Sequence, residues 1–126
     1  MRVLLVEDDG PCAELLSLRL AQLGFEVLQA QDAESALDLA REHPLDLVLS
    51  DLKLGSDGFA GEKLIRRLRE MPALTSVPIL VHSVYMHHLS DLPELAPFVD
   101  GVLPKPFAFK QLRALIADVL PLSQAS

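Results

Sequence analysis

The sequence predicts an α/β domain, a doubly wound sheet of five parallel strands with helices on both faces. Short apolar runs alternate five times with amphipathic helical patterns, and the connections between them are only a few residues long. Half of the residues are hydrophobic but only 5% are aromatic, so the core must be aliphatic, as in parallel sheets covered by helices. The 126 residues suffice for one such domain and are too few for two.

Each predicted strand is a short aliphatic run that ends in polar or turn-forming residues. The five runs cover residues 3–6, 25–28, 45–51, 77–81 and 101–103. Pro44 precedes the third run, which leads through Asp51 into a loop rich in Gly, Ser and Asp. Ligands of open α/β sheets bind at the carboxyl ends of such strands, although Asp51 also fits a simple turn residue.

Two helices are expected between the first three strands. Pro11 fits the first turn of the first helix, where its missing N–H costs nothing, and Gly24 fits the position after that helix ends. Asp32 suits the N-cap of the second helix. The apolar face of the second helix has three- and four-residue spacing, at Ala33, Ala36, Leu37 and Ala40.

The second half of the chain is expected to hold two regular helices and an irregular segment. The third helix has an apolar face at Leu64, Ile65, Leu68 and Met71. Its charged residues are expected to face water, namely Arg66, Arg67, Arg69 and Glu70. The fourth helix, within residues 85–98, is expected to be short or irregular because Pro93 and Pro97 interrupt it. A last helix has an apolar face at Leu112, Leu115, Ile116 and Val119.

Composition excludes several classes of function. The formal net charge of −7 argues against nucleic-acid binding through this domain, because phosphate backbones are bound by clustered Lys and Arg. The single cysteine, Cys12, excludes an internal disulfide, indicates a reducing compartment, and sits in an apolar pattern that predicts ordinary packing. No stretch approaches the roughly 20 apolar residues of a membrane helix, and the first residues are unlike a signal peptide. We therefore expect a cytoplasmic protein that binds no membrane.

Polar side chains interrupt the apolar pattern at the carboxyl ends of four strands. They are Glu7, Asp8 and Asp9 after the first strand, Asp51 at the third, Ser83 after the fourth and Lys105 after the fifth. Parallel strands end at one edge of the sheet, so these groups should meet there. Crowded carboxylates repel by about 1 to 4 kcal/mol per close pair, and a hard cation such as Mg²⁺ relieves that repulsion. A lysine ammonium would offset more of it.

These groups together suit phosphoryl transfer to a carboxylate. Asp51 would attack phosphorus as the nucleophile, while a metal ion would neutralise the phosphoryl oxygens. Ser83 and Lys105 would bind the remaining oxygens. Taken singly, each acid also fits a solvated loop residue and Lys105 a surface lysine; only the ordered set favours a site.

The sequence resembles the receiver domain of two-component response regulators, which has a flavodoxin-like fold, over essentially the whole chain. The matching segments are Val6-Glu7-Asp8-Asp9, the loop from Asp51 to Gly58, Ser83 after residues 78–82, and Lys105-Pro106-Phe107. The resemblance implies that Asp51 accepts a phosphoryl group. It also implies a Mg²⁺ site formed by Glu7, Asp8, Asp51 and the backbone carbonyl of Lys53.

The same resemblance implies roles for two further residues. Ser83 would be the switch hydroxyl that moves to the phosphate, and Lys105 the lysine typical of the family, with a cis bond to Pro106. Residues 1–120 would form the receiver domain, and residues 121–126 a C-terminal tail. The chain would be no enzyme beyond catalysing its own phosphorylation and dephosphorylation.

Partners follow from the resemblance as well. The phosphoryl donor would be a sensor histidine kinase or a histidine phosphotransfer protein, and phosphorylation would switch binding to a downstream protein in two-component signal transduction. We expect a monomer before phosphorylation. A stand-alone regulator and a fragment of a longer regulator or hybrid kinase both fit the chain.

Some features depart from the usual receiver pattern. Gly55 stands where the family usually has a proline, and Val102 stands where an aromatic ring usually moves with the switch hydroxyl. Val102 keeps an alternative open, a degenerate receiver that binds partners without phosphorylation, although the intact Asp51, Ser83 and Lys105 argue against it. His82, His87 and His88 are close in sequence, but no second histidine or cysteine cluster completes a metal site, so packing and solvation are predicted.

Two other classes of protein fit less well. A hydrolase with an aspartate nucleophile would need a second aspartate where Lys53 stands, and a cap over its substrate. A flavodoxin-like cofactor binder would cradle phosphate in its first loop, where Glu7, Asp8 and Asp9 would repel it.

Overall fold

The computed structural model describes residues 1–53, 60–83 and 93–120. Five parallel strands form one sheet: β1 (Arg2–Val6), β2 (Glu26–Ala30), β3 (Leu47–Asp51), β4 (Ile79–Ser83) and β5 (Gly101–Pro104). Their order across the sheet is β2-β1-β3-β4-β5, so the chain runs from β1 to the edge strand β2 and then crosses through the central β3 to the other edge at β5. The predicted doubly wound α/β fold is confirmed.

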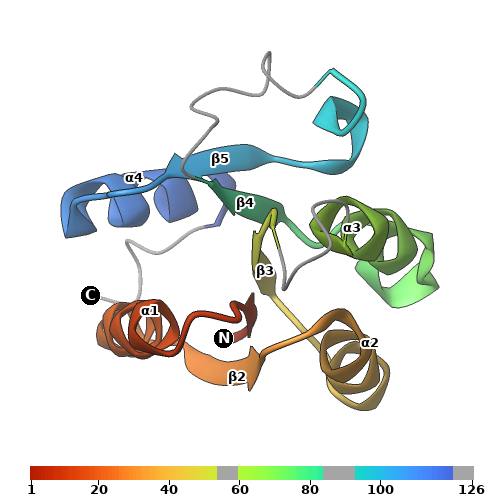
Figure 1. Ribbon diagram of the computed structural model, residues 1–126, viewed down its shortest axis with the longest axis horizontal. Coiled ribbons are helices and arrows are strands. Elements are labelled where there is room, and N and C mark those ends of the chain that lie inside the picture. The colour runs from red at the N-terminus through yellow and green to blue at the C-terminus, as the bar shows by residue number, and fades with distance from the viewer. Residues whose placement is uncertain (54–59, 84–92, 121–126) are drawn as a thin grey trace.

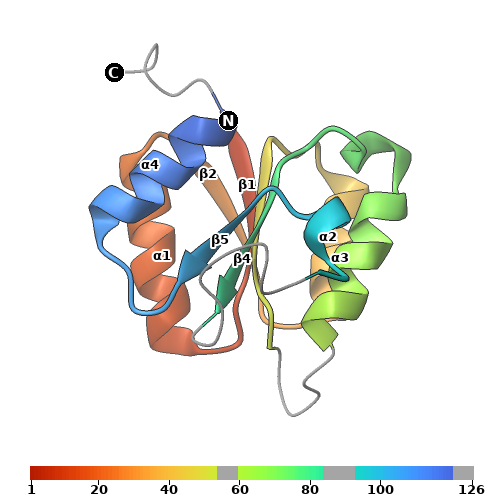
Figure 2. The same cartoon turned by 90° about the horizontal axis from the view of Figure 1, so that it is seen from above.

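Helices cover both faces of this sheet, as Figures 1 and 2 show. The helices are α1 (Gly10–Gln22), α2 (Ala33–Glu42), α3 (Ala60–Glu70) and α4 (Phe109–Val119), with 3₁₀ turns η1 (Pro72–Leu74) and η3 (Ala96–Phe98). In Figure 2, α1 and α4 lie on one side of the strands and α2 and α3 on the other. Within the described ranges, every helix is too short or too polar to span a bilayer.

The alternation of strand side chains divides the core into two apolar layers. In β1, Leu4 and Val6 point to the layer shared with α2 and α3, whereas Val3 and Leu5 point to the layer beneath α1 and α4. The central strand β3 is buried along its whole length. The buried acids Glu7 and Asp51 lie at the carboxyl edge of the sheet, which is the edge that ligands use in open α/β sheets.

Asp32 and Gly24 lie at helix ends as predicted, whereas the cap of α1 is Asp9, which the sequence analysis had grouped with the acids of the site. Asp9 caps α1, because its carboxylate accepts the backbone N–H of Cys12 at 2.9 Å. Asp32 caps α2 in the same way through the N–H of Ser35 at 2.8 Å. Gly24 follows α1 with φ +97°, a conformation that side chains rarely adopt.

Two strands lie further along the chain than predicted. β2 runs from Glu26 to Ala30 rather than over 25–28, because as an edge strand it tolerates polar Gln29, whose amide donates to the hydroxyl of Ser17. β4 runs from Ile79 to Ser83 rather than over 77–81. Its polar end is fully buried, which an apolar pattern alone does not indicate.

The expected irregular fourth helix lies partly outside the described residues. Positions 84–92 are not described, and the described remainder contains only the single 3₁₀ turn η3. The observed turn agrees with a short element at this place. Gly55 also lies outside the described residues.

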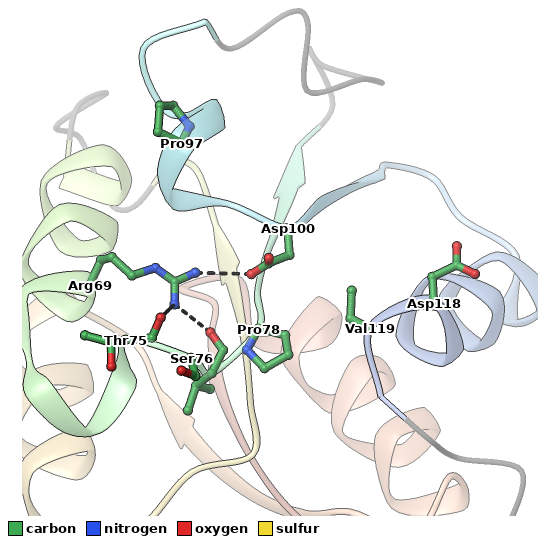
Figure 3. Close-up of a pocket in the computed structure, with 9 residues that line it drawn as sticks. Arg69, Thr75, Ser76, Pro78, Pro97, Asp100, Asp118 and Val119 are labelled. Carbon is green, nitrogen blue, oxygen red and sulfur yellow. Dashed lines mark hydrogen bonds and ion pairs between the residues drawn. The ribbon is translucent and has the colours of Figure 1, made fainter.

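Arg69 is a correction to the sequence prediction, which placed it in water. Its side chain is only 17% exposed and lies at the C-terminal end of α3, beside an open pocket of about 510 Å³ (Figure 3). The guanidinium donates to backbone carbonyls of Leu74, Val77 and Phe98, and it pairs with Asp100. A long side chain can leave the polar face of a helix and bind carbonyl groups beyond its end.

Candidate functional site

The pairing of β1 with β3 brings the predicted acids together. The register sets Val6 opposite Ser50, so the residues that follow, Glu7 and Asp51, leave the sheet side by side. One carboxylate oxygen from each of Glu7, Asp8 and Asp51 lies within 4.8 Å of the other two. We call these three residues the acidic cluster.

Lys105 reaches the acidic cluster from the end of β5. Its Nζ lies 2.9 Å from Oε1 of Glu7 and 3.1 Å from Oδ2 of Asp51. Glu7 is 1% exposed and Asp51 is 8% exposed, so one ammonium bridges two buried carboxylates. The Lys105–Pro106 peptide bond is cis, as expected.

The charges of this group shift the pKa values of its members. Burial, together with the neighbouring Glu7 carboxylate, raises the pKa of Asp51 to about 6, against the opposing effects of the Lys53 N–H and Lys105. Burial alone would lower the pKa of Lys105, but its contacts with Glu7 and Asp51 outweigh burial and raise that pKa. The site therefore combines an aspartate whose pKa is raised with a lysine ammonium that stays charged.

Ser83 and Lys53 lie around Asp51 on neighbouring segments. Ser83 is the buried last residue of β4, and its backbone carbonyl accepts the N–H of Lys105 at 2.9 Å. The N–H of Lys53 donates to Oδ1 of Asp51 at 3.1 Å, which orients the carboxylate. The role of the Lys53 carbonyl as a metal ligand stays a prediction, as does the switching role of Ser83.

The donor set of the acidic cluster fits a magnesium ion. All three side chains offer oxygen ligands, which are the ligands that Mg²⁺ prefers. Oε2 of Glu7 is buried and has no hydrogen-bond partner among the described residues, although buried polar atoms normally have one. A cation near the cluster would satisfy this oxygen and reduce the repulsion between the acids.

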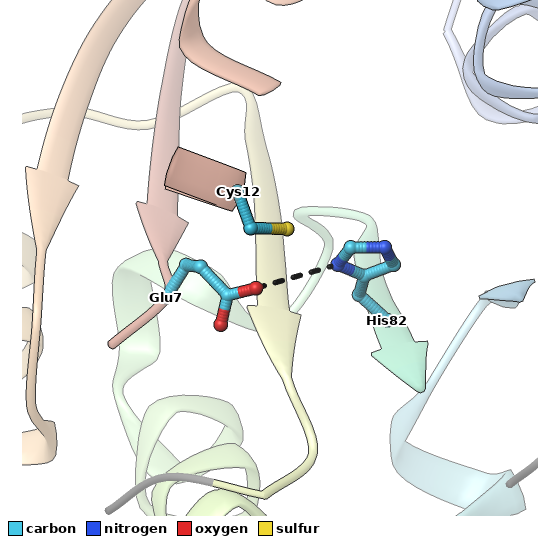
Figure 4. Close-up of side chains that lie close together, drawn as sticks. All are labelled: Glu7, Cys12 and His82. Atoms are coloured by element: carbon cyan, nitrogen blue, oxygen red, sulfur yellow. Dashed lines mark ion pairs between the residues drawn. The ribbon is translucent and has the colours of Figure 1, made fainter. Parts of the chain in front are cut away.

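Sequence analysis missed a second group of side chains around Glu7. Cys12 and His82, both assigned to packing, lie with Glu7 so that one ligand atom from each falls within 4.8 Å of the others (Figure 4). The strand period could have indicated this position of His82. Residues two apart on a strand share a face, and Leu80 packs in the layer beneath α1, the helix that carries Cys12. His87 and His88, which are close to His82 in sequence, lie outside the described residues.

A family model and the curated relatives of this chain point to the same protein family. The family model of the response regulator receiver domain matches residues 3–117. The phosphate regulon transcriptional regulatory protein PhoB of Escherichia coli K12 is 30% identical over 119 residues, covering 94% of this chain and 51% of PhoB. The chain therefore spans about half the length of the curated relatives that it matches first.

Solved structures resemble the fold closely. The chemotaxis protein CheY4 of Vibrio cholerae superimposes with a TM-score of 0.85 at 26% identity, covering 94% of this chain and 98% of CheY4. The receiver domain of the sensor histidine kinase PA1611 of Pseudomonas aeruginosa gives a TM-score of 0.77 at 24% identity, covering 94% of this chain and 95% of that domain. The PA1611 structure has a magnesium ion coordinated in its active-site cleft, and its likeness to this chain concerns the fold.

Proposed function

The chain belongs to the response regulator receiver domain family, and from this premise we propose that it accepts a phosphoryl group on Asp51. The observation that carries the proposal is the contact of Lys105 with both Glu7 and Asp51 at the carboxyl edge of the sheet. A buried aspartate beside a cation and two further acids has the environment that phosphoryl transfer requires. With a pKa of about 6, Asp51 is mostly ionised near neutral pH and can act as a nucleophile.

The proposed step is a displacement at phosphorus. A carboxylate oxygen of Asp51 attacks the phosphorus of a phosphohistidine, a P–O bond forms, and the P–N bond of the donor breaks. The electron pair of the broken bond returns to the imidazole nitrogen, and Asp51 becomes a mixed carboxylic–phosphoric anhydride. The ammonium of Lys105 would then pair with the new phosphoryl oxygens, and the hydroxyl of Ser83 would bind another.

We assign Mg²⁺ binding to Glu7, Asp8 and Asp51, with the Lys53 carbonyl as a further ligand. Bound magnesium would neutralise the negative charge of the phosphoryl oxygens. Without a metal ion, Lys105 would supply part of this positive charge, because its ammonium lies within hydrogen-bond distance of Glu7 and Asp51. The magnesium-bound receiver domain of PA1611 supports the assignment by analogy of fold.

The proposed partners are those of a signalling module. A sensor histidine kinase or a histidine phosphotransfer protein would supply the phosphoryl group, and a downstream protein would bind the phosphorylated form. The domain would act in the cytoplasm as a monomer before phosphorylation. It would catalyse only its own phosphorylation and dephosphorylation, and so is not proposed as an enzyme acting on other substrates.

Acetyl phosphate with Mg²⁺, followed by intact mass measurement, tests the proposal. The wild type should gain one phosphoryl group, and Asp51→Asn should gain none. Asp38→Asn is the matched control, because Asp38 is an exposed aspartate on α2 that pairs with the nearby Arg41. Its labelling should equal that of the wild type. Absence of labelling in the wild type at high donor concentration would contradict the proposal.

That outcome would favour the alternative, a degenerate receiver that binds its partner without phosphorylation. Val102 favours this alternative, because an aliphatic side chain packs in the α2–α3 layer where the family usually has a mobile ring. The two functions differ in their response to Asp51→Asn. Partner binding would depend on Asp51 in a phosphorylated switch and would be unaffected by its loss in a degenerate one.

A further inference from the structure

Glu7, Cys12 and His82 form a group with the ligand chemistry of a transition-metal site. Glu7 follows β1, Cys12 lies in the first turn of α1, and His82 lies near the end of β4. Figure 4 shows the three side chains pointing toward one another. We propose that these residues bind a borderline-soft divalent ion, Zn²⁺ above all. This site shares Glu7 with the acidic cluster but offers sulfur and nitrogen ligands, whereas the cluster offers oxygen alone.

The strongest evidence for a bound ligand is the buried imidazole of His82, whose nitrogens lack partners among the described residues. Its side chain is 1% exposed, and neither ring nitrogen has a hydrogen-bond partner among the described residues. Nδ1 faces Oε1 of Glu7 at 3.9 Å, too far for a hydrogen bond. Buried polar atoms are normally satisfied, so two unpaired nitrogens in one buried ring indicate a missing partner.

The position of His82 suits metal binding, because a neutral imidazole is the commonest metal ligand among side chains. Packing against Phe107 fixes the ring, since the two aromatic planes meet edge to face with centroids 5.5 Å apart. A fixed neutral imidazole is a preorganised ligand.

The distances are close to those of a tetrahedral zinc site. Zinc bonds of about 2.0 to 2.3 Å at tetrahedral angles separate neighbouring ligand atoms by about 3.3 to 3.8 Å. The Glu7–His82 pair is already at 3.9 Å, and the full group fits within 4.8 Å. Small rotations of the side chains, rather than backbone movement, would close the site.

Cys12 would bind as a thiolate. Zinc binding would release the thiol proton to solvent as the Zn–S bond forms, and no electrons would be transferred. Cys12 and His82 also line a pocket of about 350 Å³, which gives the ion and a fourth ligand, water, a way in.

The proposed ion would compete with Lys105. Nζ of Lys105 lies 2.9 Å from Oε1 of Glu7, the oxygen that also faces His82. A bound dication at that oxygen would displace the ammonium. Because Glu7 belongs to the acidic cluster as well, zinc would also weaken magnesium binding there; this last consequence rests on the proposed function.

Cobalt(II) titration of the full chain in metal-free buffer tests the site directly. A thiolate-to-cobalt charge-transfer absorption can come only from Cys12, the single cysteine of the chain. We expect this band to saturate at one ion per chain and to disappear when Zn²⁺ is added. Absence of the band in the wild type would overturn the proposal, whatever the variants do.

Calorimetric titration with Zn²⁺ then tests each ligand. Cys12→Ser and His82→Phe should each weaken zinc binding by more than about tenfold, since loss of even an outer-shell partner costs that much. Lys105→Met should strengthen it. His43→Gln is the matched control, because His43 lies at the end of α2, and should leave the affinity unchanged. Equal zinc affinity in wild type and Cys12→Ser, with circular dichroism confirming folded proteins, would contradict the assignment.

A last measurement separates this site from the proposed function. Zinc should slow acetyl phosphate labelling of the wild type and have less effect on Cys12→Ser. If the wild type is never labelled, the phosphorylation proposal fails while the cobalt band still decides the metal site. If labelling proceeds and saturating zinc leaves its rate unchanged, the two sites do not compete for Glu7, and the shared-ligand geometry is wrong.

Discussion

Lys105 and Asp51 are 54 positions apart in sequence, and Nζ of the lysine lies 3.1 Å from Oδ2 of the aspartate. The same ammonium lies 2.9 Å from Glu7, which is almost completely buried. One cation from the last strand thus holds two carboxylates from the first and third. The stability of the protein and its response to Mg²⁺ should therefore change when this contact is altered.

Lys105→Met should destabilise the metal-free protein. Removing the ammonium leaves Glu7 and Asp51 close together without a counter-ion, and we expect a loss of about 2 kcal/mol in the free energy of unfolding, less than for a fully buried pair. Urea unfolding in EDTA measures this loss, with Lys110→Met, an exposed lysine on α4, as the control. Mg²⁺ should stabilise Lys105→Met more than the wild type, because it replaces the missing charge. An equal magnesium effect in both proteins would contradict this account.

Asp51→Asn should raise the melting temperature of the metal-free protein at pH 7.5. The pKa of Asp51 rises from 3.8 to about 6 on folding, so the native state binds more protons between about pH 4 and pH 6. The wild type therefore loses stability as pH rises through this window, by on the order of 2 kcal/mol, and the loss remains above it. The Asp51→Asn variant does not lose this stability, because its side chain does not ionise.

Melting curves in EDTA from pH 3.5 to 8 measure the difference between Asp51→Asn and the wild type. The titration of His82 occurs in both proteins and largely cancels. We expect the variant to melt roughly 5 °C higher at pH 7.5, with the gap closing toward pH 4. Magnesium should narrow the gap at neutral pH. A variant that melts lower than the wild type without metal would show that the acids are not crowded.

The sequence predicted the meeting of the acids and the lysine because parallel strands leave little freedom. Once the third strand is placed next to the first, the residues after Val6 and at Asp51 have to emerge at one edge. The fifth strand then delivers Lys105 to the same edge. Strand order and register were not predicted, but parallel strands end at the same edge of the sheet in any order.

The environment of Arg69 and of His82 could not be predicted in this way. The helical period places Arg69 among solvent-facing residues, yet its guanidinium reaches the carbonyl groups after α3. The strand period indicates which face His82 occupies but not that Glu7 and Cys12 converge on it. These contacts depend on side-chain length and rotamer, which hydrophobic periodicity does not encode.

Arg69→Lys should cost about 2 to 3 kcal/mol of stability. The arginine donates to Phe98 O through two nitrogens, at 3.2 and 2.8 Å, and to Val77 O at 2.7 Å. A lysine has one donor group and cannot reproduce this planar fork, so backbone carbonyls would lose their partners. Urea unfolding at pH 7.5 measures the cost.

Arg67→Lys is the matched control for Arg69→Lys, because both residues lie on α3 and both variants replace an arginine by a lysine. Arg67 is 53% exposed and lies 4.0 Å from Glu34, a surface pair worth little. Its free energy of unfolding should stay within about 0.5 kcal/mol of the wild type. Similar losses in both variants would mean that the carbonyl contacts of Arg69 contribute nothing specific.

Gly61→Ala should disturb the end of β3 and with it Asp51. A Cβ at Gly61, in the first turn of α3, would overlap the backbone carbonyl of Leu52 and come within 2.8 Å of the carbonyl oxygen of Asp51. Backbone atoms cannot yield as a flexible side chain can, so we expect a loss of about 2 kcal/mol or more and slower labelling by acetyl phosphate. Gly10→Ala is the control, because a Cβ there meets no described atom within 4 Å. If both variants unfold and label like the wild type, α3 does not pack on the end of β3 as closely as the structure has it.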